Sequence, residues 1–139
     1  MLDAISATDI AVQGVRAQRI RMNVIANNIA NAQATRTPEG GAFRRQMVIV
    51  RGEQLAPNID PDKFGVRVKA VVNDMSPFRS VFDPSHPDAN EDGMVEYPNV
   101  NIATEMVDLL TAQRAYEANI DVMLSVRKMN DKALEIIQV

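Results

Sequence analysis

The chain has 139 residues, a formal net charge of −3, 46% hydrophobic residues and only 4% aromatic residues. This length predicts a single domain, and the aliphatic character of the apolar residues favours helix packing over a large core built on aromatic anchors. The sequence contains no cysteine, which excludes disulfides, thiolate catalysis and Cys-ligated metal sites.

The first predicted element is a helix from about Asp3 to about Ala32. One of its faces carries an apolar repeat of seven residues, and a second apolar stripe lies on the far side of the helical wheel. A helix that is apolar on two faces needs more than one partner. The Pro-Glu-Gly-Gly sequence of Pro38–Gly41 cannot continue it. The first stripe is Thr8, Val15, Met22 and Ile29, flanked by Ile5, Val12 and Ile25, and the second is Ile10, Ala17, Ile20 and Val24.

Residues 42–98 predict short strands and loops, because six of the seven prolines fall here. A β-rich run lies between Arg45 and Arg51. Residues 65–72 alternate between apolar and charged side chains, which is typical of a half-buried strand. From Ser76 to Pro98 we expect mostly turns and loops, with one short strand at Met94–Tyr97.

The second predicted helix runs from about Ile102 to about Ile137, with Asn101 as its N-cap. Helices of roughly 45 and 50 Å do not fit inside a globule of about 140 residues, so they predict an extended arm. Two heptad lines run along the second helix. One is Ile102, Leu109, Tyr116, Met123, Asn130 and Ile137, and the other is Met106, Gln113, Ile120, Arg127 and Leu134.

The fold class predicted from these elements is mainly α with a small β region (α+β). The long N- and C-terminal helices are expected to pack as an antiparallel coiled-coil arm, with a small β-rich domain between them. The expected division is an N-terminal helix at 1–36, a β-rich and loop domain at 37–98, and a C-terminal helix at 99–139.

Both predicted helices carry an unusual number of amide side chains. Asn is a poor helix former, and Lys or Glu would serve a solvated face better. We therefore expect these amides to fix the register of contacts between subunits, with a solvated polar face as the alternative. The predicted subunit-packing residues are Val15, Met22, Asn23, Ile25, Asn27, Asn28, Ile29, Asn31, Met106, Leu109, Gln113, Tyr116, Asn119, Ile120 and Met123.

The charge is distributed unevenly. Residues 1–69 carry ten Lys and Arg against six Asp and Glu, a net charge of +4, and residues 70–139 carry a net charge of −7. Opposite signs predict attraction between the two ends of one chain or of neighbouring chains, although two solvated faces remain the alternative. If the two helices are antiparallel, the basic residues of the first could form ion pairs with acidic residues of the second. The candidate interhelix charge pairs join Arg16, Arg19 and Arg21 to Glu117 and Asp121.

Other chemistries are weakly supported. Asp88, Asn90 and Asp92 match the first half of a calcium-binding loop, but position twelve is Asn99 instead of Glu, so an Asx-rich turn is favoured. His86 is a lone histidine without catalytic partners. We find no catalytic motif, predict no cofactor, and expect neither nucleic acid nor a small-molecule substrate as a partner.

The N-terminus does not predict a cleaved signal peptide, because Asp3 and Asp9 are acidic where a signal is basic. No apolar run reaches the roughly 18–20 residues of a membrane span. Export from the cytoplasm would therefore need a route that does not use a classical signal.

Two segments at opposite ends of the chain carry a resemblance to bacterial flagellar rod and hook axial proteins. Residues 26–32 (ANNIANA) resemble the N-terminal signature of that family, and residues 112–119 (AQRAYEAN) resemble its C-terminal signature. The segments 41–46, 65–68 and 93–100 resemble the short proximal-rod members. Residues 37–43 (TPEGGAF) depart from the compact turn of distal-rod and hook members, which favours the proximal-rod type.

The resemblance implies a structural subunit of the proximal rod and no enzyme. Members of this family polymerise with copies of themselves and other rod proteins into the drive shaft of the basal body, in the periplasmic space. They pass unfolded through the flagellar type III export apparatus. Their terminal helices line the shaft and a β-rich domain lies outside. The alternative that the residues leave open is a soluble coiled-coil adaptor.

Overall fold

The computed structural model describes residues 7–56 and 60–137. It confirms the α+β class, with two helices and two separate two-stranded antiparallel sheets in this part of the chain. The elements are α1 (Ala7–Ala30), β1 (Gln46–Ala56), β2 (Asp60–Asn73), β3 (Arg79–Phe82), β4 (Met94–Tyr97) and α2 (Ile102–Ile137).

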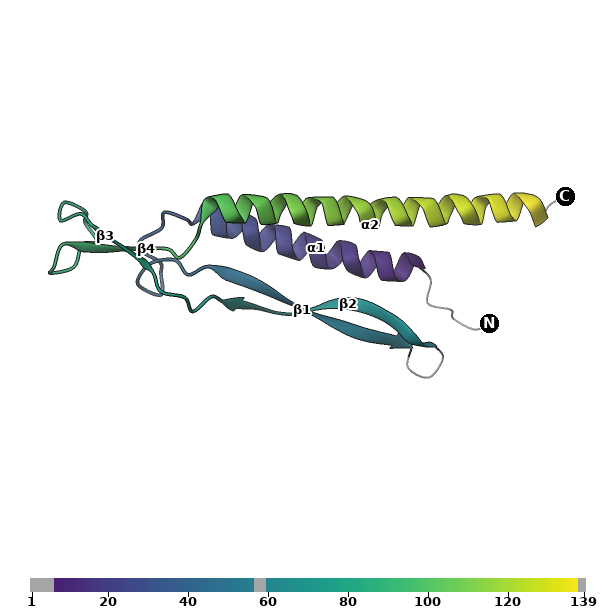
Figure 1. Cartoon of the computed structure of the whole chain (residues 1–139), viewed down its shortest axis with the longest axis horizontal. Coiled ribbons are helices and arrows are strands. Elements are labelled where there is room, and N and C mark those ends of the chain that lie inside the picture. The colour runs from purple at the N-terminus through teal and green to yellow at the C-terminus, as the bar shows by residue number, and fades with distance from the viewer. Residues whose placement is uncertain (1–6, 57–59, 138–139) are drawn as a thin grey trace.

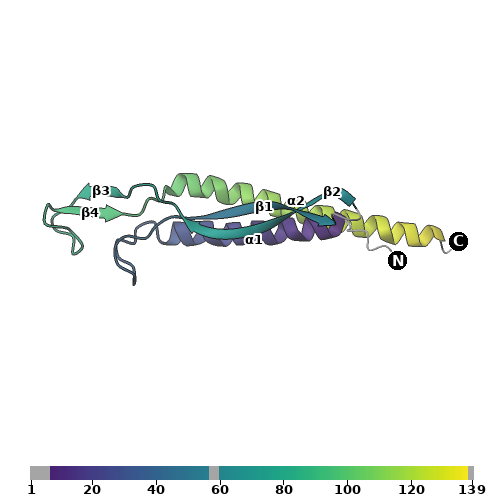
Figure 2. The same ribbon diagram turned by 90° about the horizontal axis from the view of Figure 1, so that it is seen from below.

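The molecule is elongated and has three layers along most of its length (Figure 1). Helix α1 lies in the middle, with α2 on one side and the β1–β2 hairpin on the other. In the view from below, the β1–β2 hairpin overlies the two helices, and the β3–β4 hairpin lies at the end away from the start of α1 and the end of α2 (Figure 2). The two apolar stripes of α1 are thus explained by two partners within the chain.

The two helices run antiparallel. Gly14 on α1 lies against Asn119 on α2, and Asn28, fourteen residues later, contacts Glu105, fourteen residues earlier. A Cβ atom at Gly14 would approach the Asn119 side-chain oxygen to 2.6 Å, so the absence of a side chain there allows close approach of the helices. The buried apolar positions of the helices are small or slender: Ala11, Ala17, Ile25 and Ala112.

The helix boundaries agree with local sequence signals. Helix α2 begins at the predicted Ile102, and the side-chain oxygen of Asn101 accepts a hydrogen bond from the Thr104 amide at 3.2 Å, as an N-cap does. Helix α1 ends at Ala30, two residues before the predicted end. Its predicted first residues, Asp3–Ser6, lie outside the described residues.

The β1–β2 hairpin extends beyond the predicted limits of both its strands. All but the first residue of the expected run 45–51 lies in β1, and the run 65–72 lies inside β2, in strands of 11 and 14 residues. The ladder pairs Gln46 with Asn73 at its base and carries register shifts between Ile49 and Val50 and between Gln54 and Ala56. A two-stranded sheet is marginal by itself, and this one is supported by packing on α1.

The expectation of mostly turns and loops over 76–98 is corrected for Arg79–Phe82, which forms strand β3 and pairs with the predicted strand Met94–Tyr97. All four residues of β3 are exposed, so neither face of this strand is buried and its sequence need not alternate between apolar and polar residues. The strand exists because the chain turns back over 83–93 and supplies a partner. Gly93, with φ of +72°, completes that turn.

Candidate functional site

A cluster of polar side chains joins α1, the base of the β1–β2 hairpin and the start of α2. We call it the polar junction and define it as Asn28, Arg45, Gln46, Asp74 and Glu105. Asn28 and Glu105 are almost completely buried, at 0% and 1% exposed. Buried polar groups cost free energy unless they are paired, so the geometry of each one matters.

Asn28 uses both ends of its amide at this junction. The Asn28 Nδ2 group donates to the Gln46 carbonyl at 2.8 Å and to Glu105 Oε2 at 2.9 Å. The Asn28 Oδ1 atom accepts from the Gln46 backbone amide at 2.9 Å. One side chain therefore pins the first residue of β1 to α1 and ties both to α2.

Arg45 supplies the positive charge of the junction. Its Nε atom donates to Glu105 Oε1 at 2.6 Å, and an Nη1 atom lies 3.4 Å from Asp74 Oδ2. Burial lowers the pKa of Arg45, but its hydrogen bond with Glu105 and the charge of that carboxylate outweigh burial, so the pKa is raised. The guanidinium therefore stays charged and neutralises the buried carboxylate of Glu105.

Asp74 is held in its charged form by a local turn. The Ser76 amide donates to Asp74 Oδ1 at 2.9 Å, and this backbone hydrogen bond, followed by one from the Ser76 side chain, lowers the pKa of Asp74. Asn99 completes the connection, because its Oδ1 accepts from the Arg45 amide and its Nδ2 donates to the carbonyls of Asp74 and Ser76. The strand ends and the entry to α2 are thereby locked together.

The second candidate site is the solvent face of the helices. On α2, Met106, Val107, Leu110, Leu124 and Leu134 are between 50% and 63% exposed. The exposed side chains of α1 recur at helical spacing and form one face: Arg16, Arg19, Asn23, Ala26, Asn27 and Ala30. Contiguous apolar side chains on a surface mark an interaction site more often than isolated ones do.

The predicted subunit-packing residues divide into three groups in this structure. Ile25 and Asn28 are buried, and Asn28 makes its hydrogen bonds within the chain. The exposed group is Asn23, Asn27, Met106 and Gln113, and the half-buried group is Val15, Met22, Ile29, Asn31, Leu109, Tyr116, Asn119, Ile120 and Met123. Their role between subunits stays a prediction.

The predicted interhelix charge pairs also stay a prediction. The ion pair found for Arg21 is with Asp108, at 3.8 Å. Glu117 accepts a hydrogen bond from Gln113 on its own helix at 3.1 Å. Arg16, Arg19 and Asp121 are exposed.

The calcium-like loop is a hydrogen-bonded turn in this structure. Thr35 donates to Asp88 Oδ2 at 2.8 Å, and Arg36 pairs with the other oxygen of the same carboxylate. The Asn90 side-chain oxygen accepts from the amides of Asp92 and Met94. These oxygen atoms therefore already have donors from the chain itself.

Sequence reasoning placed Asn28 in a subunit contact and missed the other members of the polar junction. Arg45, Asp74 and Glu105 lie far apart in the chain and have no fixed spacing. Two features of the sequence could have drawn attention to these residues. Arg45 belongs to an Arg pair just before the first strand, and Glu105 lies four positions after the N-cap Asn101. Neither identifies its partner.

Comparison with known proteins places this architecture among axial proteins of the bacterial flagellum. The family model described as "Flagella basal body rod protein" matches residues 9–36, and "Flagellar basal body rod FlgEFG protein C-terminal" matches residues 91–136. The two matches cover α1 with the turn after it, and β4 with most of α2. The class defined by fold and site is therefore that of the flagellar basal-body rod proteins.

Full-length relatives narrow the assignment. The flagellar basal-body rod protein FlgC of Borreliella burgdorferi is 42% identical, over 96% of this chain and 97% of the relative. The FlgC proteins of Bacillus subtilis and Aquifex aeolicus are 36% and 35% identical, each over 97% of this chain. The chain belongs to the FlgC family of flagellar basal-body rod proteins.

Membership of this family confirms the predicted function. The chain is a structural subunit of the proximal rod and not an enzyme, and it belongs to the flagellar basal body together with other basal-body components. Among residues 7–56 and 60–137, no helix is both long and apolar enough to cross a membrane.

Proposed function

We propose that the chain polymerises through α1 and α2, which form an antiparallel coiled-coil arm, into the torque-transmitting shaft of the rod. The observation that carries this proposal is the unequal length of the two helices. Among residues 7–56 and 60–137, α2 has 36 residues and α1 has 24, and α2 extends past Ala7, the first described residue of α1 (Figure 1). Twelve additional helical residues correspond to about 18 Å of helix.

The extending part of α2 carries apolar side chains with no covering element among the described residues. Leu134 is 58% exposed. Met129 and Ile136 are 62% and 77% exposed. An amphipathic helix of this kind gains stability from a packed partner more than from intrinsic propensity, so neighbouring subunits are the natural cover.

The finer details of location and partners belong to the same proposal. The chain assembles with copies of itself and with other rod proteins, in the periplasmic part of the basal body. It is exported by the flagellar type III apparatus without a cleaved signal peptide. The helices at 1–36 and 99–139 form the axial part and residues 37–98 form the outer part. We keep the exposed amides Asn23, Asn27 and Gln113 as register-setting contacts between subunits.

The test is complementation in a flagellated bacterium that lacks its own FlgC. The variant Leu110→Gln/Leu134→Gln removes two exposed apolar contacts, and Thr111→Gln/Lys132→Gln places the same side chains at exposed neighbouring positions. We expect the first variant to lose motility and assembled rods in electron micrographs, and the control to keep both. Fully buried Leu side chains are worth about 1.5–3 kcal/mol each, and every copy in the rod repeats the loss.

Both variants should fold like the parent protein, because all four positions are already exposed. Circular dichroism of the purified chains checks this. Equal motility and equal rod assembly in the two variants would contradict the proposal that the helical faces carry polymerisation.

A further inference from the structure

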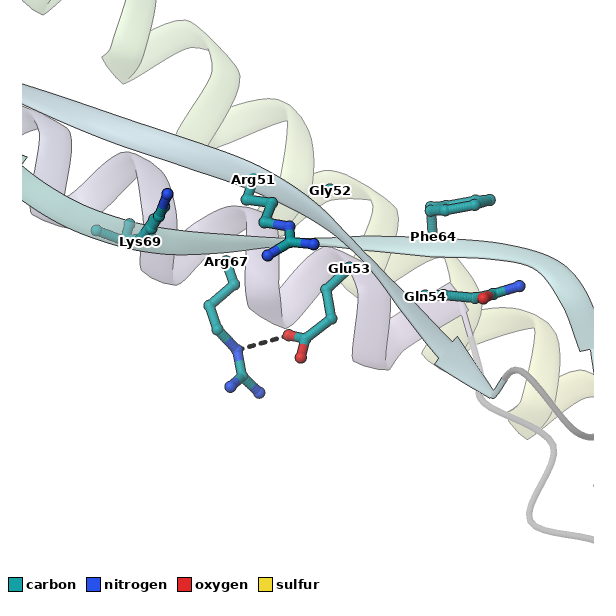
Figure 3. Close-up of a pocket in the computed structure, with 8 residues that line it drawn as sticks. Arg51, Gly52, Glu53, Gln54, Phe64, Arg67 and Lys69 are labelled. Carbon is teal, nitrogen blue, oxygen red and sulfur yellow. Dashed lines mark ion pairs between the residues drawn. The ribbon is translucent and has the colours of Figure 1, made fainter.

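The β1–β2 hairpin carries a concentration of positive charge. Arg51 on β1 and Arg67 on β2 are direct partners in the ladder, so their side chains leave the same face of the sheet. Lys69 lies two residues further along β2, at the register shift between Ile49 and Val50, and lines the same groove. The three residues together are called the basic face (Figure 3). The acidic residue here is Glu53, which pairs with Arg67 Nε at 2.6 Å.

The basic face lines a groove of about 590 Å³ whose other walls include Gln54 and Phe64. Phe64 is 59% exposed, and its ring lies on the opposite side of the hairpin from the Arg67 side chain (Figure 3). Like charges directly opposite each other destabilise an antiparallel pair, and within the described residues neither Arg51 nor Lys69 has an ion-pair partner. An external anionic partner would offset this repulsion.

A partner with matching charge exists on the same chain. Residues 80–113 contain no Lys or Arg, and the β3–β4 hairpin, which begins with Arg79 over the Tyr97 ring, exposes Glu91, Asp92 and Glu96. Phe82 on β3 is 68% exposed. We call this surface, with Glu91, Asp92, Glu96 and Phe82, the acidic tip.

The acidic tip cannot reach the basic face of its own molecule. The β3–β4 hairpin lies at one end of the elongated chain, and the β1–β2 hairpin runs back along α1 towards the other end (Figures 1 and 2). Contact between these two surfaces therefore requires two molecules.

We propose that the acidic tip of one copy docks in the basic groove of a second copy. Glu91, Asp92 and Glu96 then face Arg51 and Lys69. The dimensions agree, because four-residue strands span about 13 Å and residues 50–54 span about 16 Å. Such a contact joins different surfaces of the two copies, so it propagates into an open chain of subunits instead of closing into a dimer. The inference rests on the proposed function and adds a second contact outside the helices.

The absence of cysteine allows a direct cross-linking test on the full chain. One preparation carries Gly52→Cys beside the basic face, where a Cβ atom would meet open space, and the other carries Ser80→Cys on β3, opposite Glu96. A third preparation carries Ser125→Cys at an exposed position on α2 as the matched control. We expect mild oxidation to give several-fold more heterodimer from the 52 and 80 mixture than from the 52 and 125 mixture.

Charge reversal then tests the electrostatic part. Arg51→Glu/Lys69→Glu in the Gly52→Cys preparation should lower the yield by about tenfold, from two lost charge pairs. Glu91→Lys/Asp92→Lys in the Ser80→Cys preparation should restore it. Raising the salt concentration from 0.1 to 1 M shortens the screening length from about 10 to about 3 Å and should reduce the parent yield in the same way.

The inference is overturned if the 52 and 80 mixture forms no more heterodimer than the control mixture, or if the second pair of reversals does not restore the yield. Motility separates this failure from failure of the proposed function. If Arg51→Glu/Lys69→Glu leaves rods intact while Leu110→Gln/Leu134→Gln prevents their assembly, the proposed helical contacts are supported and the proposed hairpin contact is refuted. If Arg51→Glu/Lys69→Glu destroys rods without rescue by Glu91→Lys/Asp92→Lys, the basic face binds a different protein and the inference is also wrong.

Discussion

Replacing Asn28 by alanine should destabilise the chain far more than the same change at Asn27. The two residues are adjacent on α1 and chemically identical, but Asn28 is fully buried and Asn27 is exposed. Asn28→Ala leaves the Gln46 amide, the Gln46 carbonyl and Glu105 Oε2 each without one hydrogen bond. Asn27→Ala removes an exposed bond to the Gln46 side chain at 3.2 Å and a contact from Asn31.

The magnitude follows from these three losses. An unsatisfied buried polar group costs about 1–3 kcal/mol, and the losses are not additive because all three lie in one network. We therefore expect Asn28→Ala to lower the free energy of unfolding by about 3–5 kcal/mol. A substitution at an exposed position away from such a network usually changes it by less than about 0.5 kcal/mol, which is the expectation for Asn27→Ala.

Urea unfolding of the purified full chain, followed by far-ultraviolet circular dichroism, measures both values, since the sequence has no tryptophan to follow. Asn28→Asp is a useful third variant, because it keeps the size of the side chain but places a second carboxylate against Glu105. Equal destabilisation by Asn27→Ala and Asn28→Ala would refute the role assigned to the polar junction.

Two further predictions concern the strand ends and the β3–β4 turn. The pKa of Asp74 lies below its ordinary 3.8, first because of the Ser76 backbone hydrogen bond, so its stabilisation is present above that value and is lost as the pH falls through the folded-state pKa. Asp74→Asn should therefore weaken the acid dependence of the unfolding midpoint between about pH 5 and pH 2, and an unchanged dependence would exclude this carboxylate as its source. Gly93→Ala should lower stability by about 1 kcal/mol or more, because Gly93 has a φ of +72° and a Cβ atom would lie 3.0 Å from Phe82. Gly52→Ala is the matched control, since its Cβ atom meets open space, and equal thermal midpoints for the two variants would contradict this account.

The helices show how much the sequence could determine. The heptad lines, the N-cap Asn101 and the Pro-Gly segment after α1 are local signals. They predicted the start of α2 to the residue and the end of α1 to within two residues. The two stripes of α1 also predicted two partners, since a helix of this pattern cannot bury both faces on one neighbour. The signatures at 26–32 and 112–119 indicated the family because they are continuous in sequence.

The polar junction shows what local signals could not reach. Asn28 and Glu105 are 77 residues apart, and Arg45 and Glu105 are 60 apart, so no periodicity links them. Strand β3 was missed for a related reason, because an exposed strand has no alternating burial and depends on its partner across a turn.

The sequence by itself determined the start of α2, the end of α1 to within two residues and the apolar stripes of the helices, because those depend on side chains within a few residues of each other. Only the tertiary structure decided that the β1–β2 hairpin packs on α1, and that the Asn28 side chain bonds Gln46 and Glu105. Both depend on which distant segments meet, and hydrogen bonds between distant segments become specific only after the chain has folded.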